Sequence, residues 1–444
     1  MAIQLSDHFT YKRLMRFVIP SIIMMVFTSI YSVVDGIFVS NFAGATAFAA
    51  VNLIAPFMGL VPAIGFMLGT GGTALVAFTL GTGKKKDANE MFSLLVYVTI
   101  GLGIFFTILY EVTLRPVALF LGATDAMMPY ILIYGRIIPL SLTFFMLQSL
   151  FGSFMVTAEK PKLGLWFTVM AGLTNIVLDA LFVGVFKWGI AGAGVATALS
   201  ETLGGVVPFL YFTFPNSSLL RLGKAYRNWK MVLFRTCTNG ISEFLTNVSI
   251  SFVNVIYNYQ LLRMIGENGV SAYGVVMYTS FTFLSVFFGY TLGSGPLVGY
   301  HYGAGNWEEL KNLFKKSVVL TVAFSLVMLT LSLGFAKPLS GIFVGYDAEL
   351  FKLTVRAFLL YSLGYLLAGL NIFASAFFTA LNNGIVSGIL SFSRVLVFQI
   401  AAVMLLPLLI GTDGVWLAMP VAELLSLAVS VYYIRKMRSV YHYM

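Results

Sequence analysis

A few acidic and amide side chains lie inside long apolar segments, and these residues are best placed to do chemistry. Asp35 has apolar neighbours on both sides, and Glu243 lies in another apolar segment. Asn175 and Asp179 are four residues apart, so both face the same side of one helix. An ionisable group inside a membrane is costly and marks an ion or substrate pathway. A carboxylate and an amide oxygen one turn apart suit a proton or a hard cation.

The composition indicates that these segments cross a membrane. Only 10% of the 444 residues are Asp, Glu, Lys or Arg, 59% are hydrophobic, and the mean hydropathy is +0.92. A soluble globular chain, with about 25% charged residues, is excluded. Apolar runs of about 20 or more residues predict an all-α membrane protein with twelve transmembrane helices. The expected spans are 15–39, 48–79, 91–113, 128–157, 163–186, 191–214, 232–262, 270–301, 312–336, 350–380, 387–410 and 414–436.

The net charge of +10 follows from the topology that these spans imply. Most of the 27 Lys and Arg residues cluster at the chain ends and in alternate loops. These clusters are Lys12 to Arg16, Lys84 to Lys86, Lys160 to Lys162, Arg221 to Arg235, Lys311 to Lys316 and Arg435 to Arg438. The positive-inside rule predicts a multi-pass protein of the plasma or inner membrane, with both termini in the cytoplasm. Because topology accounts for the charge, no nucleic-acid partner is expected.

The chain repeats itself at about half its length. A shift of 222 residues places Thr157-Ala158 on Thr379-Ala380, Gly192 on Gly414, and Glu201 on Glu423. The pattern predicts two pseudo-symmetric six-helix lobes, residues 1–214 and 231–444, joined by a cytoplasmic linker at 215–230. Because six is even, an axis along the membrane normal would relate the lobes, as in some secondary transporters. Such a fold encloses a cleft that opens alternately to either face.

Catalytic motifs and cofactor sites are not visible in the sequence. The chain has no Gly-x-Ser-x-Gly, HExxH, Walker A or CxxC pattern, and Cys237 is its single cysteine. We expect no enzyme and no cofactor, and an ion gradient or the substrate's own gradient as the energy source. The 41 Phe, 22 Tyr and 20 Met residues include enough side chains for a cleft that takes flat, lipophilic cations. The expected partners are small cationic or amphipathic molecules and membrane lipid, with the monomer as the functional unit.

Other charged residues of the apolar body are interpreted as structural. Glu201 and Glu423 occupy equivalent places in the two lobes, which favours a shared packing role. Arg136 and Arg356 lie near the outer ends of their spans, where they are expected to snorkel or pair with acids. His301 lies at the inner end of its span and has no evident Ser or Cys partner.

Several stretches together resemble the multidrug and toxic compound extrusion (MATE) transporters over essentially the whole chain. They are Ile19-Pro20, Val34 to Val39, Ala49 to Pro56, Asn175 to Asp179, Gly192 to Thr197, Gly293 to Gly299 with Gly303-Ala304, and Asn239 to Glu243 followed by Tyr257-Asn258. The last of these is similar to a bacterial subgroup of multidrug exporters. The resemblance implies two lobes arranged in a V, export of organic cations and drugs, and coupling to inward flow of H⁺ or Na⁺.

The resemblance also implies site residues. The cation-coupling positions are Asp35, Asn175, Asp179 and Thr197 in the first lobe and Glu243 in the second, with Asp35, Asn175 and Asp179 as candidate Na⁺ ligands. For the substrate cleft we expect Gln148, Asn254, Tyr257 and Asn258. Two departures from the family pattern stand out. The loop Val156 to Pro161 lacks the common Arg and Gly-Asp/Asn-Pro, and span 350–380 has Asn371 where the sodium-coupled branch often has a carboxylate.

These observations lead to a secondary active antiporter that exports organic cations or drugs in exchange for H⁺ or Na⁺, both ions remaining open. The alternative is a lipid-linked oligosaccharide flippase of the same superfamily. A flippase would need several cationic residues in its central cavity to bind pyrophosphate, whereas the intramembrane charges here are mainly acidic. A membrane-embedded enzyme or receptor would need a clustered catalytic set or a signalling domain, and neither is visible.

Overall fold

The structure is a computed structural model that describes residues 3–42 and 45–444, without the side chains of residues 35–42, 45, 48, 49 and 56. Its regular structure is helical, and the described residues contain no strand. Apolar side chains cover these helices almost all round, as is typical of a bundle that is buried in lipid and in itself. The all-α class predicted from the sequence is confirmed.

The first half of the chain forms six helical spans. They are α1 (Tyr11–Phe42), α2 (Ala45–Gly81), α3 (Lys85–Phe120), α4 (Met128–Thr157), α5 (Pro161–Asp179) with the π-helical turn η1 (Ala180–Val185), and α6 (Gly189–Thr213). The second half forms α7 (Trp229–Met264), α8 (Glu267–Gly303), α9 (Trp307–Val344), α10 (Ala348–Ser362) with α11 (Tyr365–Ala380), α12 (Gly384–Phe392) with η2 (Ser393–Phe398) and α13 (Gln399–Ile410), and α14 (Asp413–Tyr441). Within the described residues these elements make the predicted twelve-helix, two-lobe architecture.

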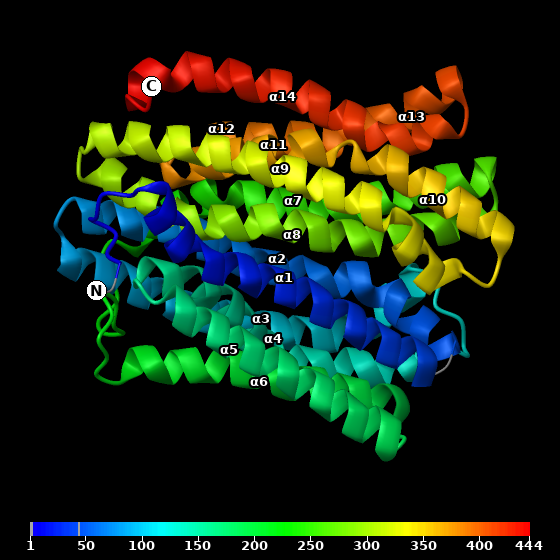
Figure 1. Ribbon diagram of the computed structural model, residues 1–444. Coiled ribbons are helices and arrows are strands. Elements are labelled where there is room, and N and C mark those ends of the chain that lie inside the picture. Colours follow the sequence, from blue (N-terminus) through cyan, green and yellow to red (C-terminus); the bar gives the residue numbers. More distant parts are fainter. Residues whose placement is uncertain (1–2, 43–44) are drawn as a thin grey trace.

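In the part of the chain that the structure describes, up to eleven of these spans are long and apolar enough to cross a membrane. Among the described residues, ten helices are long and apolar enough to cross a membrane, and the pair α10 and α11, bent by 46°, makes a further candidate. Helix α7 does not qualify, because Asn, Ser and Thr residues and Glu243 lower its hydropathy. It nonetheless lies in the middle of the bundle (Figure 1), where it packs against α2, α8 and α12.

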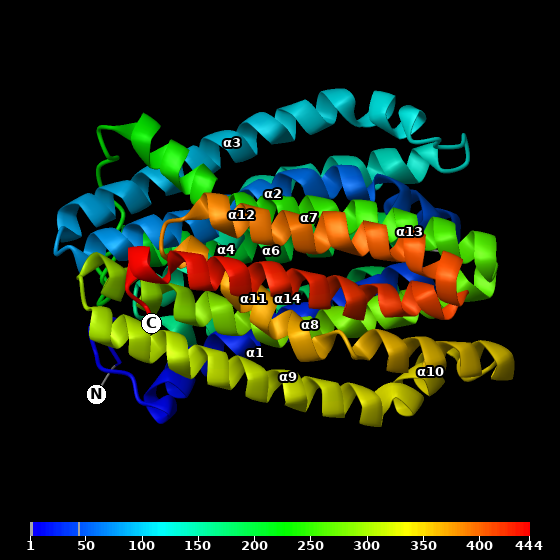
Figure 2. The same ribbon diagram turned by 90° about the horizontal axis from the view of Figure 1, so that it is seen from above.

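The two halves of the chain meet where α1 and α2 pack against α7 and α8 (Figures 1 and 2). Here backbone approaches backbone. A Cβ atom at Gly240 would lie 2.0 Å from the carbonyl oxygen of Met67, and one at Gly303 would lie 2.1 Å from that of Phe78. Glycine is required at such close helix crossings. Gly303 ends α8, so the lobes are closed against each other at the end of the bundle that carries the α2–α3 and α8–α9 loops.

The segment that precedes α1 ties both lobes together at this closed end. The side chains of Leu5 and Phe9 are fully buried. The Leu5 N–H donates to Glu159 Oε1 (2.6 Å), which lies between α4 and α5 in the first lobe. The Phe9 N–H donates to Glu309 Oε1 (2.9 Å) on α9 of the second lobe, and Glu309 Oε2 also pairs with His8 Nδ1 (2.5 Å). The segment therefore links elements that are otherwise far apart in the sequence.

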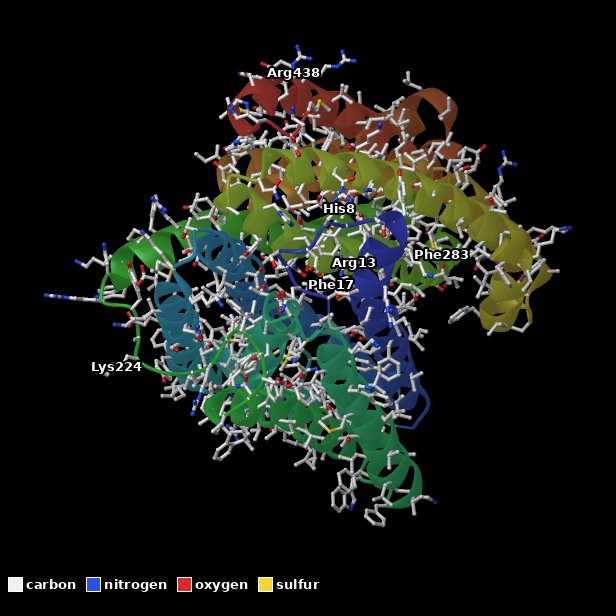
Figure 3. All side chains as sticks on the ribbon, turned by 60° about the vertical axis from the view of Figure 1, so that its left-hand side comes forward. His8, Arg13, Phe17, Lys224, Phe283 and Arg438 are labelled. Atoms are coloured by element: carbon white, nitrogen blue, oxygen red, sulfur yellow. The ribbon has the colours of Figure 1, made fainter. Side chains whose placement is uncertain are left out.

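Basic residues also gather at this end. Figure 3 views it with His8 and Arg13 near the centre and with Lys224 and Arg438 projecting at the periphery. Both chain termini lie at the same end of the bundle (Figure 1). This arrangement agrees with an even number of spans, and the cytoplasmic orientation of this end stays a prediction from the positive-inside rule.

Candidate functional site

A buried polar group lies inside the first lobe, where α5 faces α6. Asp179 is fully buried and Asn175 is 2% exposed. Asn175 Nδ2 lies 3.5 Å from Thr197 Oγ1 on α6, so the structure brings these two predicted coupling residues together, and Asp179 follows one turn further along α5. The side chain of Asp35, the fourth residue predicted in this lobe, lies outside the described residues.

Local features of this group favour a cation. Buried amide oxygens are normally hydrogen-bonded, yet Asn175 Oδ1 receives no hydrogen bond from any described residue. Asp179 ends the α-helical part of α5, and the π-helical turn η1 follows directly. Such turns occur frequently at functional sites. A carboxylate, an amide oxygen and a hydroxyl are oxygen donors of the kind that hard cations prefer.

The second lobe presents a polar stripe along α7. Glu243, Asn247, Asn254 and Asn258 follow one another at intervals of 4, 7 and 4 residues, which places them on one helical face. All four keep some accessible surface, and Asn258 is exposed. Glu243 is half-buried and lies in a part of the bundle where α7 packs against α2, α8 and α12. The described residues place no hydrogen bond or ion pair on its carboxylate.

The structure separates the four predicted substrate contacts. Asn254 lies on the α7 stripe and accepts a hydrogen bond from Tyr273 Oη (2.8 Å), and Asn258 lies one turn further. Tyr257 is fully buried in the core of the second lobe, stacked on the Tyr273 ring with 4.6 Å between centroids. Gln148 lines a small pocket between α4, α5 and α6 inside the first lobe. Of the four predicted residues, the α7 stripe therefore holds only the two asparagines.

A buried ion pair in the second lobe was missed by the sequence reasoning. Arg394 on η2 approaches Glu423 on α14 with 3.2 Å between Nε and Oε1, and the two side chains are 13% and 5% exposed. Asn371 on α11 donates from Nδ2 to Glu423 Oε2 (2.7 Å) and to the Glu423 carbonyl oxygen (2.8 Å). Ser430 orients this amide by donating to Asn371 Oδ1 (2.9 Å). An arginine within an apolar run was the available signal, since it is as unusual there as an acid.

The symmetry-related acid of the first lobe has a different partner. Glu201 on α6 accepts a hydrogen bond from Ser141 Oγ (2.6 Å) on α4. Sequence analysis assigned Glu201 and Glu423 one shared role, but Glu423 is bound to a guanidinium and an amide. The repeat therefore preserves the acid, and the contacts described above for the two acids differ: a hydroxyl for Glu201, and a guanidinium and an amide for Glu423.

The peripheral charges are placed as expected. Arg136 Nε lies 3.8 Å from Glu111 Oε2, and Arg356 Nε donates to Asp413 Oδ1 (2.9 Å), so each pairs with an acid. His301 is 1% exposed and packs edge-on against Phe9, with 6.4 Å between the ring centroids. His301 therefore packs against the segment that precedes α1 and is not part of the polar groups described above.

Comparison with known proteins identifies the family. The MatE family model matches residues 20–181 and 244–405, once in each half of the chain. The multidrug export protein MepA of Staphylococcus saprophyticus is 22% identical over 371 residues, and MepA of Staphylococcus aureus strain NCTC 8325 is 22% identical over 374 residues; each alignment covers 81% of both chains.

Solved structures share the fold. A MATE protein in complex with MaL6 matches with a TM-score of 0.92 at 21% identity, covering 99% of this chain and 98% of that one. A MOP superfamily transporter from Pyrococcus furiosus, described as having a binding pocket of reverse polarity, matches with a TM-score of 0.89 at 21% identity, covering 98% and 97%. Because the family model covers most of the chain, and because the architecture agrees, this protein belongs to the MatE family of membrane transporters.

Proposed function

We propose that the protein is a secondary active antiporter that exports small cationic, amphipathic molecules in exchange for H⁺ or Na⁺. The observation that carries this proposal is an acidic group in the interior of each lobe, Asp179 with Asn175 in the first and Glu243 in the second. Acids inside a membrane are costly and mark the pathways of ions, protons or substrates. The names of the MepA relatives, multidrug export proteins, support the export of drugs.

The acidic groups of the two lobes suit different ligands of the transport cycle. Asn175 and Asp179 are buried beside the half-buried Thr197 and offer oxygen atoms, so this group suits a small ion that has shed its water. Glu243 retains accessible surface beside the asparagines of α7, so it suits a larger organic cation. Binding of H⁺ or Na⁺ in the first lobe would remove a buried charge there and favour another packing of that lobe against α7 and α8.

Antiport then follows from competition between the two ligands. If the coupling ion stabilises the lobe arrangement that binds the drug weakly, the drug must weaken binding of the ion by the same factor. In the described conformation the lobes are closed at the end that carries Gly303 and the N-terminal segment. A cleft that reaches Glu243 therefore has to open toward the opposite end, which is the arrangement needed to release an exported molecule.

The test is efflux of ethidium from proteoliposomes in which the pH gradient and the Na⁺ gradient are imposed independently. We expect efflux to follow one of the two gradients and to be lost in Asp179→Asn. Glu201→Gln is the matched control, because it removes an intramembrane acid of the same lobe that is bound to Ser141. Full gradient-driven efflux in Asp179→Asn, or efflux that ignores both gradients, would refute the proposal.

The flippase alternative depends on Arg394. This residue is an intramembrane cation of the type that a pyrophosphate-binding cavity needs, but its guanidinium already pairs with Glu423. The neighbouring stripe on α7 offers a carboxylate and amides. The same vesicles, loaded with a fluorescent lipid-linked oligosaccharide, distinguish the two functions, and we expect no translocation of that lipid.

A further inference from the structure

Three charged residues lie in the middle of the second lobe. They are Glu243 on α7, Arg394 on η2 and Glu423 on α14, and η2 packs against both of the other helices. The remaining charged residues between 229 and 441 lie toward the helix ends or in the connecting loops, apart from Arg356 in α10, which is exposed and pairs with Asp413. The interior of this lobe therefore contains two carboxylates and one guanidinium.

The ion pair within this group is held firmly in place. Glu423 has both carboxylate oxygens occupied, Oε1 by Arg394 and Oε2 by Asn371, and Ser430 fixes the Asn371 amide. Removing one charge of such a buried pair would leave the other uncompensated, so the two residues act as a unit. Arg394 and Glu423 therefore contribute no net charge to the lobe.

Glu243 is left as the uncompensated charge. The η2 turn that carries Arg394 packs against α7, but no hydrogen bond or ion pair of the described residues joins the Arg394 and Glu243 side chains. When Glu243 is ionised, the three residues sum to a charge of −1. In an interior of low dielectric constant such a site binds one monovalent cation favourably, whereas a divalent cation leaves an excess positive charge.

We propose that Arg394 determines charge specificity, by setting the interior of the second lobe to −1 and so selecting monovalent over divalent organic cations. The inference rests on the proposed export function and names its substrate class more closely. Arg394 acts here through the total charge of the site and through its bond to Glu423. It is therefore a specificity-determining residue whose effect can be reversed by removing a second charge.

The experiment compares two probes that share one ring system, the monovalent ethidium and the divalent propidium. Binding of each to the purified full-length protein in detergent is followed by fluorescence, and the ratio of the two affinities is the readout. We expect wild type to prefer ethidium. Arg394→Gln changes the site to −2 and should shift the ratio at least tenfold toward propidium, whereas Arg394→Lys should keep the wild-type ratio.

Two further variants separate charge from structure. Arg394→Gln combined with Glu423→Gln restores the charge to −1, so the ethidium preference should return. Glu423→Gln alone leaves the lobe neutral and should weaken the binding of both probes. Glu201→Gln, the equivalent change in the first lobe, should leave the ratio unchanged, because Glu201 has a hydroxyl partner in Ser141.

The outcomes distinguish this inference from the proposed function. A ratio in Arg394→Gln that stays at the wild-type value, or a double variant that fails to recover the ethidium preference, overturns the charge assignment. If Arg394→Gln does not fold, Glu423→Gln still tests the charge assignment. Undiminished binding of ethidium by Glu423→Gln would overturn the assignment. Gradient-driven efflux of ethidium by wild type tests antiport separately, because the binding ratio needs no gradient.

Discussion

The close contact between the lobes leads to a quantitative prediction for Gly303→Ala. The added Cβ would lie 2.1 Å from the Phe78 carbonyl oxygen, where ordinary van der Waals contact begins at about 3.4 Å. Helix α8 belongs to the second lobe and α2 to the first, so relief requires the lobes to separate by about 1 Å at this end. Overpacking of this kind costs about 1–3 kcal/mol. The cost applies to the closed arrangement, so the population ratio should shift roughly 5- to 150-fold toward the arrangement that is open at this end.

Disulfide cross-linking between cysteines introduced near the ends of α2 and α8, in a Cys237→Ser background, measures this shift. We expect Gly303→Ala to slow cross-linking markedly, and ethidium efflux to fall because one arrangement dominates. Gly295→Ala is the matched control on the same helix, because no atom lies within 4 Å of the place that its Cβ would occupy. Equal cross-linking rates in the two variants would refute the argument that the glycine contact holds the closed state.

Three further predictions concern stability, read as the midpoint of thermal unfolding in detergent. Phe9→Ala should cost about 3–5 kcal/mol, because the ring is fully buried between the lobes, and an unchanged midpoint would show that the segment is not docked. Burial raises the pKa of the Glu159 carboxyl, and the Leu5 N–H, which favours the carboxylate, opposes this only in part. The net contribution of this carboxyl to stability is therefore largest at acid pH and falls as pH rises through the raised value. Glu159→Gln should therefore match wild type near pH 4 and exceed it in stability at pH 7; a constant difference across this range would contradict the assignment. Asn371→Ala should cost about 1–3 kcal/mol, because Glu423 loses a donor in a buried site, and this loss should shrink if Glu423 is also changed to Gln.

Much of the architecture was predictable because its determinants are local. A run of apolar residues predicts a span wherever it folds, and helical periodicity alone places Asn175 and Asp179 on one face. The half-length repeat predicts two lobes, because it is found by comparing the sequence with itself and needs no knowledge of contacts between helices. The span 232–262 was predicted as one of these apolar runs, although the hydropathy of α7 is too low for a clear membrane signal.

What the tertiary structure decided are contacts between helices. Neither the approach of Thr197 to Asn175 nor the pairing of Arg394 with Glu423 has a periodic signature, because each joins two different helices. The link from Phe9 to Glu309 spans 300 residues. The sequence by itself determined which residues are costly inside a membrane. Packing decided which of those charges are neutralised, because neutralisation depends on distances of a few ångströms between helices that sequence spacing does not specify.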